Sequence, residues 1–232
     1  MAPPGNAWAG IPVEVDVSSP VKVDIWSDIA CPWCYIGKRK FEEGVRRFGA
    51  DVEVEYHSFE LSPDTPVDFE GSAADYLAGR KGLPKERVTQ MIDTVIGIAS
   101  SVGLDYDYDA LQHTNTVKAH QLLHYAKERG RQIEMKERLL QAYFVEGRHV
   151  GRVQDLADLA AELGFDRADV LRALEADEHL GAVRQDQAQA AAYGINGVPF
   201  FVLDGRYGVS GAQDPAVFAE ALTQVAAERV AQ

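Results

Sequence analysis

The stretch Val21-Lys22-Val23-Asp24-Ile25-Trp26-Ser27-Asp28-Ile29-Ala30-Cys31-Pro32-Trp33-Cys34 decides the fold of this chain. Its first half alternates like a β-strand, and the run that follows it, from Tyr35 to Phe48, has the apolar spacing of a helix. The chain contains only two cysteines, and both lie where the strand gives way to the helix. Because two thiols one helical turn apart can close a disulfide with little backbone movement, this stretch predicts redox chemistry.

The two cysteines are expected to differ in reactivity. Cys31 should lie at the opening of the helix, where unpaired backbone N–H groups and the positive end of the helix dipole favour an exposed thiolate of lowered pKa. Cys34 lies one turn further in and should be shielded. We therefore predict that Cys31 is the nucleophile that attacks a disulfide and that Cys34 resolves the mixed intermediate, with Pro32 and Trp33 tuning both thiols.

Two other interpretations of the cysteine pair are weaker. A structural zinc site needs about four ligands, and no second cysteine pair is present, although histidines could complete a site. His120 and His124 have a spacing that can hold a metal, but no acid lies between them as in the zincin motif. A purely structural disulfide closing so short a loop would remove little chain entropy. We therefore predict no bound metal.

The run from Ser27 to Lys38 resembles the active-site segment of the FrnE-type branch of the DsbA-like thioredoxin-fold oxidoreductases. Further matches are Asn115-Thr116, Ala119-His120, Ala142-Tyr143-Phe144, Glu146-Gly147, Gly194 to Phe201, and Ser210 to Gln213. Together they cover almost the whole chain from about Val21. The resemblance implies an α/β thioredoxin fold with a large inserted all-helical subdomain, and it implies that Cys31 is the nucleophile.

The resemblance also assigns roles outside the cysteine motif. It implies a cis peptide bond between Val198 and Pro199, close to the dithiol, where the backbone before the proline would dock a substrate as an added strand. His120 is expected to face the redox cleft. Asp24 resembles the buried acid that assists the resolving thiol in thioredoxin, but the run to the first cysteine is one residue longer here. An acid at a strand edge facing solvent is the alternative for Asp24.

The rest of the chain fits four consecutive regions. Residues 1–20 form an N-terminal extension that contains an alternating run, 13–17, suited to an edge strand. Residues 21–61 form the first half of the thioredoxin-like domain, with a second strand over 52–57. Residues 62–189 form the helical insertion. Residues 190–232 form the second half, with strands near 198–203 and 206–210 around an Asp204-Gly205 turn and a final helix after Asp214-Pro215.

Seven helical patterns are predicted for the insertion and its end. They cover residues 73–80, 85–101, 117–129, 133–144, 153–163, 168–175 and 178–193. Each is apolar on one face, so the helices should pack together and against the sheet.

Composition limits the partners. A net charge of −13 over 232 residues disfavours nucleic acid or an anionic membrane as the main partner. No apolar run approaches the ~20 residues of a membrane span, and the first residues lack the pattern of a standard signal peptide, so we expect a cytoplasmic protein. Its expected partners are protein or small-molecule disulfides and thiols. No cofactor is expected, glutathione is a candidate redox partner, and the chain is expected to be a monomer or a homodimer.

These observations predict a thiol-disulfide oxidoreductase or isomerase. The alternative is a glutathione-dependent isomerase or a kappa-type glutathione transferase of the same fold, acting on a small aromatic or polyketide-like substrate. Enzymes resembling 2-hydroxychromene-2-carboxylate isomerase carry a serine where Cys31 stands here, so the complete dithiol favours the oxidoreductase.

Overall fold

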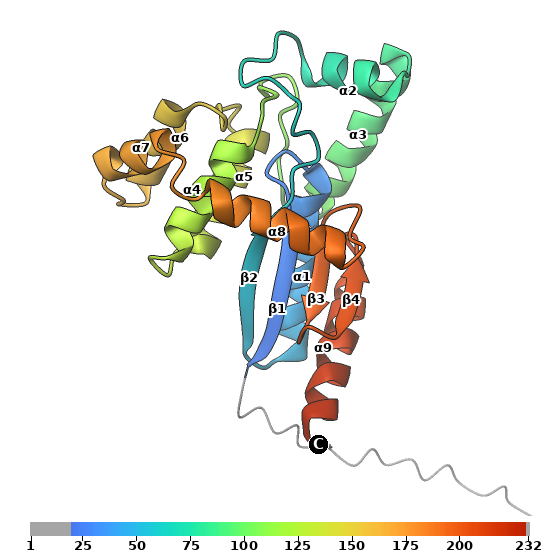
Figure 1. Cartoon of the computed structure of the whole chain (residues 1–232). Helices are drawn as coiled ribbons and strands as arrows, with labels where there is room; N and C mark the ends of the chain where they lie inside the picture. The colour runs from blue at the N-terminus through green and yellow to red at the C-terminus, as the bar shows by residue number, and fades with distance from the viewer. Residues whose placement is uncertain (1–19, 231–232) are drawn as a thin grey trace, which may run out of the picture.

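The computed structural model describes residues 20–230 and shows a mixed four-stranded sheet with helices on both faces (Figure 1). The elements in chain order are β1 (Val21–Ser27), α1 (Pro32–Phe48), β2 (Val52–Ser58), α2 (Ala73–Lys81), α3 (Lys85–Ser101), α4 (Val117–Lys127), α5 (Gln132–Phe144), α6 (Val153–Glu162), α7 (Arg167–Glu175), α8 (Leu180–Ala192), β3 (Phe200–Leu203), β4 (Tyr207–Ser210) and α9 (Pro215–Val230). The predicted edge strand over 13–17, like residues 1–19 of the predicted extension, lies outside the described residues.

The sheet has the strand order β2-β1-β3-β4, which is the predicted thioredoxin arrangement. β1 runs parallel to β2, with Val21 opposite Val52, and antiparallel to β3, with Trp26 opposite Phe200. β3 and β4 form the predicted hairpin, in which Asp204 and Gly205 both have positive φ angles (51° and 65°). Because β1 and β3 are central neighbours, the end of β1 that leads to Cys31 lies beside the start of β3.

The two faces of the sheet carry different helices. Val23 and Ile25 of β1 point to one face, where they form a core with Phe41 of α1 and Phe218 of α9. Trp26 points to the other face, which α8 crosses (Figure 1), and its indole N–H donates to the backbone oxygen of Asp186 in α8. The side chains of alternate β1 residues therefore point to opposite faces of the sheet.

Helices α2 to α8 lie between β2 and β3 in the sequence, as the helical patterns predicted. The largest core cluster joins α4, α5, α6 and α7 through side chains such as Leu122, Leu139 and Leu156. The predicted helix over 178–193 begins instead at Leu180, because Asp177 adopts a left-handed conformation (φ 54°) that separates it from α7. Within residues 20–230, no helix is long and apolar enough to cross a membrane.

Candidate active site

The dithiol lies at the first turn of α1. Cys31 is the N-cap residue with an extended backbone (φ −95°, ψ 113°), Pro32 occupies the first turn, and the Cys34 N–H donates to the Cys31 carbonyl oxygen at 3.0 Å. Proline suits this position because its missing N–H would have no partner in a helix anyway. Both cysteines are free thiols. The predicted position of the pair at a strand-to-helix junction is confirmed.

Burial of the two cysteines differs from the prediction. Cys31 and Cys34 are each 3% exposed, so the expectation that Cys31 is exposed and Cys34 alone is shielded is wrong. A residue of the insertion lies next to the motif, because the Tyr106 hydroxyl donates to the Pro32 carbonyl oxygen at 2.8 Å. Trp33, between the cysteines, is 39% exposed. Any asymmetry between the thiols must therefore come from their neighbours.

The loop before β3 supplies the neighbour of Cys31. The Val198–Pro199 peptide bond is cis, as predicted. The Cys31 Sγ atom lies 3.5 Å from the Val198 carbonyl oxygen. The close approach of the loop to α1 requires a glycine, because a Cβ atom at Gly37 would lie 2.9 Å from Cγ of Pro199. Cys31, Val198 and Pro199 are thus brought together as the sequence predicted, whereas Cys34 faces the interior.

The electrostatics of the pair reverse one expectation. A hydrogen bond to Cys34, together with burial, raises the pKa of Cys31 well above its ordinary value. Burial also opposes ionisation of Cys34, but the hydrogen bond from Cys31 and the positive charge of Lys136 lower the pKa of Cys34 overall. Of the two thiols, Cys34 therefore loses its proton more readily than Cys31. The predicted low pKa of Cys31 is wrong for this arrangement, because the neighbouring sulfur outweighs the helix terminus.

Lys136 of α5 is the functional candidate that the sequence analysis missed. Its side chain is completely buried, and its Nζ atom has no hydrogen-bond partner among the described residues. It lies over the ring of Tyr56, 5.5 Å from the centroid. Burial lowers the pKa of Lys136 to about 8, even though the nearby cysteines favour its charged form. The sequence did contain a signal for this residue: Lys136 is four and seven positions before Leu140 and Tyr143, so it lies on the same face of the helix as these two core residues.

Asp28 anchors the loop between β1 and Cys31. This carboxylate is 2% exposed and accepts hydrogen bonds from the Leu61 N–H at 2.8 Å and the Thr116 hydroxyl at 2.8 Å, and it lies 3.3 Å from His120 Nε2. Burial works against its charge, but these hydrogen bonds, His120 first, lower the pKa of Asp28. His120 is fully buried behind this loop and reaches the cysteine motif only through Asp28.

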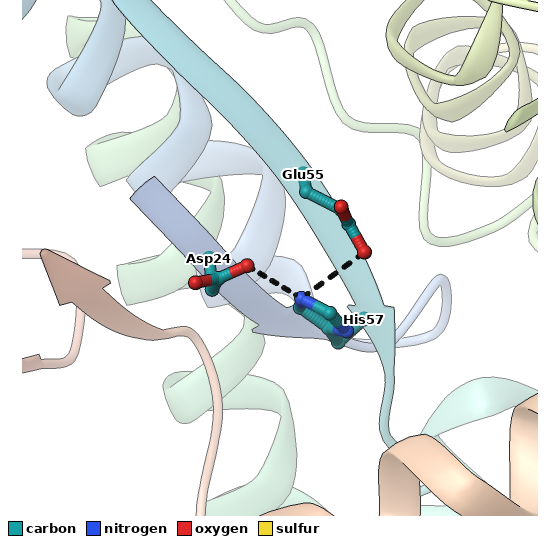
Figure 2. Close-up of side chains that lie close together, drawn as sticks. All are labelled: Asp24, Glu55 and His57. Atoms are coloured by element: carbon teal, nitrogen blue, oxygen red, sulfur yellow. Dashed lines mark hydrogen bonds and ion pairs between the residues drawn. The ribbon is translucent and has the colours of Figure 1, made fainter. Parts of the chain in front are cut away.

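Asp24 takes a third position that neither interpretation described. It points to the α8 face of the sheet, away from α1 and Cys34, and its Oδ1 atom lies 2.9 Å from Nε2 of His57. Figure 2 shows Asp24 of β1 and Glu55 of β2 converging on the same imidazole. The other ring nitrogen, Nδ1, lies 3.0 Å from Oδ1 of Asp186. Asp24 is therefore a half-buried partner of His57 and is on the wrong face to serve the resolving thiol.

Asp24, Glu55 and His57 are the one group among residues 20–230 whose ligand atoms converge closely enough to hold a metal ion. Both carboxylates already have cationic partners, since Lys22 lies 3.3 Å from Asp24 and Lys127 pairs with Glu55. A protonated His57 completes this arrangement without a metal. His120 and His124 have separate partners, because His120 lies 3.3 Å from Asp28 whereas His124 lies 3.0 Å from Asp186.

Comparisons with known proteins agree with this geometry. Residues 22–223 match the family described as the DSBA-like thioredoxin domain. The uncharacterized protein YwbO of Bacillus subtilis is 31% identical over 205 residues, which are 88% of this chain and 96% of YwbO.

Two solved structures extend the comparison. A "probable DsbA oxidoreductase" from Streptomyces coelicolor is 41% identical and has a TM-score of 0.83, with 90% of this chain and 91% of that chain covered. A 2-hydroxychromene-2-carboxylate isomerase has a TM-score of 0.70 at 15% identity, covering 90% of this chain and 98% of that one. The second likeness concerns the fold alone.

Proposed function

Because the chain belongs to the DsbA-like thioredoxin domain family, we propose that it is a thiol-disulfide oxidoreductase of the FrnE-type branch. The observation that carries the proposal is the position of Cys31, which lies at the N-terminus of α1 with its thiol 3.5 Å from the carbonyl oxygen of Val198. Cys31 is thus next to the backbone on which an extended substrate can dock, and Cys34 is one turn behind it. This arrangement supports Cys31 as the attacking residue and Cys34 as the resolving residue.

The reaction begins with a proton transfer within the pair. When the Cys34 thiol is ionised, its sulfur accepts the thiol proton of Cys31, and Cys31 becomes the nucleophilic thiolate. The Cys31 thiolate attacks one sulfur of a disulfide, R–S–S–R′. The bond between the two substrate sulfurs breaks, and R′–S⁻ leaves while R–S stays bonded to Cys31.

Resolution requires Cys34 to lose that proton again. The departing R′–S⁻ accepts it and becomes R′–SH. The Cys34 thiolate, stabilised by the positive charge of Lys136, then attacks Sγ of Cys31 and displaces R–S⁻, which takes a proton from solvent. The substrate disulfide is reduced to two thiols and the dithiol is oxidised to a disulfide. Glutathione, as the thiol donor, returns the protein to the dithiol form, and the same steps run in reverse oxidise a substrate.

The test measures disulfide exchange directly. The protein is equilibrated with mixtures of reduced and oxidised glutathione, and the fraction of intramolecular disulfide is followed by alkylation and intact mass. In parallel, the protein is tested as a catalyst of hydroxyethyl disulfide reduction by glutathione. We expect one two-electron transition and catalysis, both lost in Cys31→Ser. A wild-type protein that shows neither the transition nor catalysis overturns the proposal.

The isomerase and transferase alternative lacks a comparable observation. The likeness to the 2-hydroxychromene-2-carboxylate isomerase concerns the fold alone at 15% identity. The close pairing of two free thiols here supports disulfide exchange instead.

A further inference from the structure

A cavity of about 260 Å³ opens beside the dithiol, on the side of the helical insertion. Its walls come from the loop before α1, from α2, from the stretch 108–116 and from the end of α5. Apolar side chains such as Leu77, Leu111 and Phe144 make up much of the lining. For scale, a cavity of about 150 Å³ accommodates benzene, so this one is large enough for one substituted ring.

The cavity reaches the residues on both sides of Cys31. Ala30 and Pro32 are part of its wall. Tyr108 also lines it, and burial raises the pKa of this tyrosine. A molecule in the cavity would be placed next to the proposed nucleophile.

His113 provides a polar atom that the protein itself leaves unused. Its side chain is 8% exposed, Nδ1 lies 3.0 Å from the Tyr143 hydroxyl, and Nε2 has no partner among the described residues. The imidazole packs on Tyr76 with a centroid distance of 3.6 Å, which fixes its orientation. Burial lowers the pKa of His113 to about 4, so the ring is uncharged at neutral pH. A buried nitrogen without a partner is costly, and His113 is one of the residues that line the cavity, so a ligand that shifts the wall enough to reach Nε2 would remove that cost.

Other polar groups in the wall are already satisfied. Asp28 accepts hydrogen bonds from Leu61 and Thr116, and the Thr114 hydroxyl donates to the Val67 carbonyl oxygen at 2.7 Å. Arg80 and Lys81, at the end of α2, add two exposed cations to the rim, although Arg80 also lies 3.3 Å from Asp64 and donates to the Leu61 carbonyl oxygen at 3.1 Å. In a chain with a net charge of −13, this local positive charge favours an anionic ligand.

On the basis of the proposed function, we propose that this cavity binds the substrate: a low-molecular-weight disulfide with one aromatic ring and an acidic group. The ring would lie against Leu77, Leu111 and Phe144, the acidic group would face Arg80 and Lys81, and a polar substituent would meet His113 Nε2. The sulfur of such a molecule would then lie beside Cys31. The exchange steps are those given above, with glutathione as the thiol donor.

The test compares two disulfides. Dithiobis(nitrobenzoate) carries an aromatic ring and a carboxylate, whereas hydroxyethyl disulfide carries neither. The rate constant for oxidation of the reduced protein is measured with each, and their ratio is the readout. The variants are Leu77→Trp, which fills the cavity, and Arg80→Ala combined with Lys81→Ala. Arg87→Ala, an exposed cation of α3 outside the cavity, is the matched control.

We expect the ratio to fall at least about tenfold in Leu77→Trp and by a smaller factor in the double alanine variant, with no change in Arg87→Ala. An unchanged ratio in both cavity variants overturns the cavity assignment while leaving disulfide exchange intact. If wild type reacts with neither disulfide, the proposed function fails instead. If insulin reduction falls as much as nitrobenzoate disulfide reduction, the cavity serves protein side chains, and the small-molecule assignment is overturned.

A binding measurement keeps the proposal testable without exchange chemistry. Nitrobenzoate, which has no disulfide, is titrated calorimetrically into Cys31→Ser and into the same variant carrying His113→Phe. Phenylalanine keeps an aromatic ring on Tyr76 but removes the Nε2 atom. Saturable binding that weakens with His113→Phe supports the site, and an absence of binding to Cys31→Ser contradicts it. Thermal unfolding of each variant checks that the fold is retained.

Discussion

The Sγ atom of Cys31 lies 3.5 Å from the carbonyl oxygen of Val198, although 167 positions separate the two residues in the chain. The contact exists because β1 and β3 are antiparallel neighbours, so the end of one strand meets the start of the other. This contact places the Cys31 sulfur beside the Val198 carbonyl oxygen, whereas the neighbours of the Cys34 sulfur are Ser27 and Lys136. The two thiols are equally buried and yet differ in what they can reach.

This difference predicts unequal trapping of mixed disulfides. Cys34→Ser should still attack oxidised glutathione through Cys31 but be unable to release it, so the glutathione adduct should accumulate. Cys31→Ser leaves a thiol directed to the interior and should trap little. Intact mass after exposure to oxidised glutathione measures both adducts. Neither variant should lose much stability, because the disulfide closes too short a loop to constrain the unfolded chain. Equal accumulation on the two variants would contradict the proposed roles.

Gly37→Ala should disturb the contact between α1 and the loop at Pro199. The added Cβ would lie 2.9 Å from Cγ of Pro199 and 3.4 Å from Cβ of Ala212, so at least one of these neighbours would have to shift. We expect the loop to move, the free energy of unfolding to fall by about 1–3 kcal/mol, and the rate of hydroxyethyl disulfide reduction to fall at least about tenfold.

Gly97→Ala is the matched control, because a Cβ at this exposed position of α3 would meet nothing within 4 Å. This variant should keep full activity and gain up to about 1 kcal/mol, the usual advantage of alanine over glycine in a helix. Full activity in Gly37→Ala would show that the tight approach of Pro199 is not needed for exchange.

Lys136→Met should change the balance between the dithiol and the disulfide. The lysine charge stabilises the Cys34 thiolate, which only the reduced form contains, so its removal should favour the disulfide and make the potential more negative by about 30 mV or more. The same substitution removes a buried cation without a hydrogen-bond partner, and should therefore stabilise the oxidised protein more than the reduced one. Equilibration with glutathione and denaturant unfolding of both forms measure the two effects.

Lys85→Met, at an exposed lysine of α3 remote from the dithiol, provides the control for the loss of one positive charge. It should leave the potential of the Cys31–Cys34 couple unchanged. A potential in Lys136→Met equal to that of the control would mean that Lys136 does not act on the cysteine pair.

The parts of the site that the sequence predicted follow from local patterns and from the family resemblance. The alternation of residues 21–26 and the apolar spacing after Tyr35 place Cys31 at a helix cap without any tertiary information. Val198 and Pro199 could be placed beside Cys31 only through the resemblance, because their contact depends on the pairing of β1 with β3.

The parts that the sequence did not predict depend on contacts between distant segments. The prediction that Cys31 is exposed was wrong, and the groups found beside the motif, the Val198 carbonyl and the Tyr106 hydroxyl, belong to segments far away in the sequence. The prediction of a low pKa for Cys31 was wrong because the hydrogen bond to the Cys34 sulfur raises the pKa of Cys31, while Lys136 helps to lower the pKa of Cys34 instead. His57 carried no sequence pattern, and its environment arises only when β1, β2 and α8 come together. Burial and charge pairing of this kind cannot be read from spacing along one element.

His57 makes stability depend on pH in a direction that can be checked. Burial opposes its charge, but hydrogen bonds to Asp186 and Asp24 raise the pKa of His57 from 6.5 to about 9. Because the folded protein binds this proton more tightly than the unfolded chain, the stabilisation is complete below pH 6.5 and is lost as the pH rises through about 9. The advantage of wild type over His57→Gln in free energy of unfolding should therefore shrink by up to about 3 kcal/mol across that range. Denaturant unfolding of both proteins at a series of pH values measures this change.

His149→Gln is the control, since burial lowers the pKa of His149 and its contribution to the free energy of unfolding should not vary above pH 6.5. A constant difference between wild type and His57→Gln from pH 6.5 to 9 would show that His57 is not charged in the folded protein.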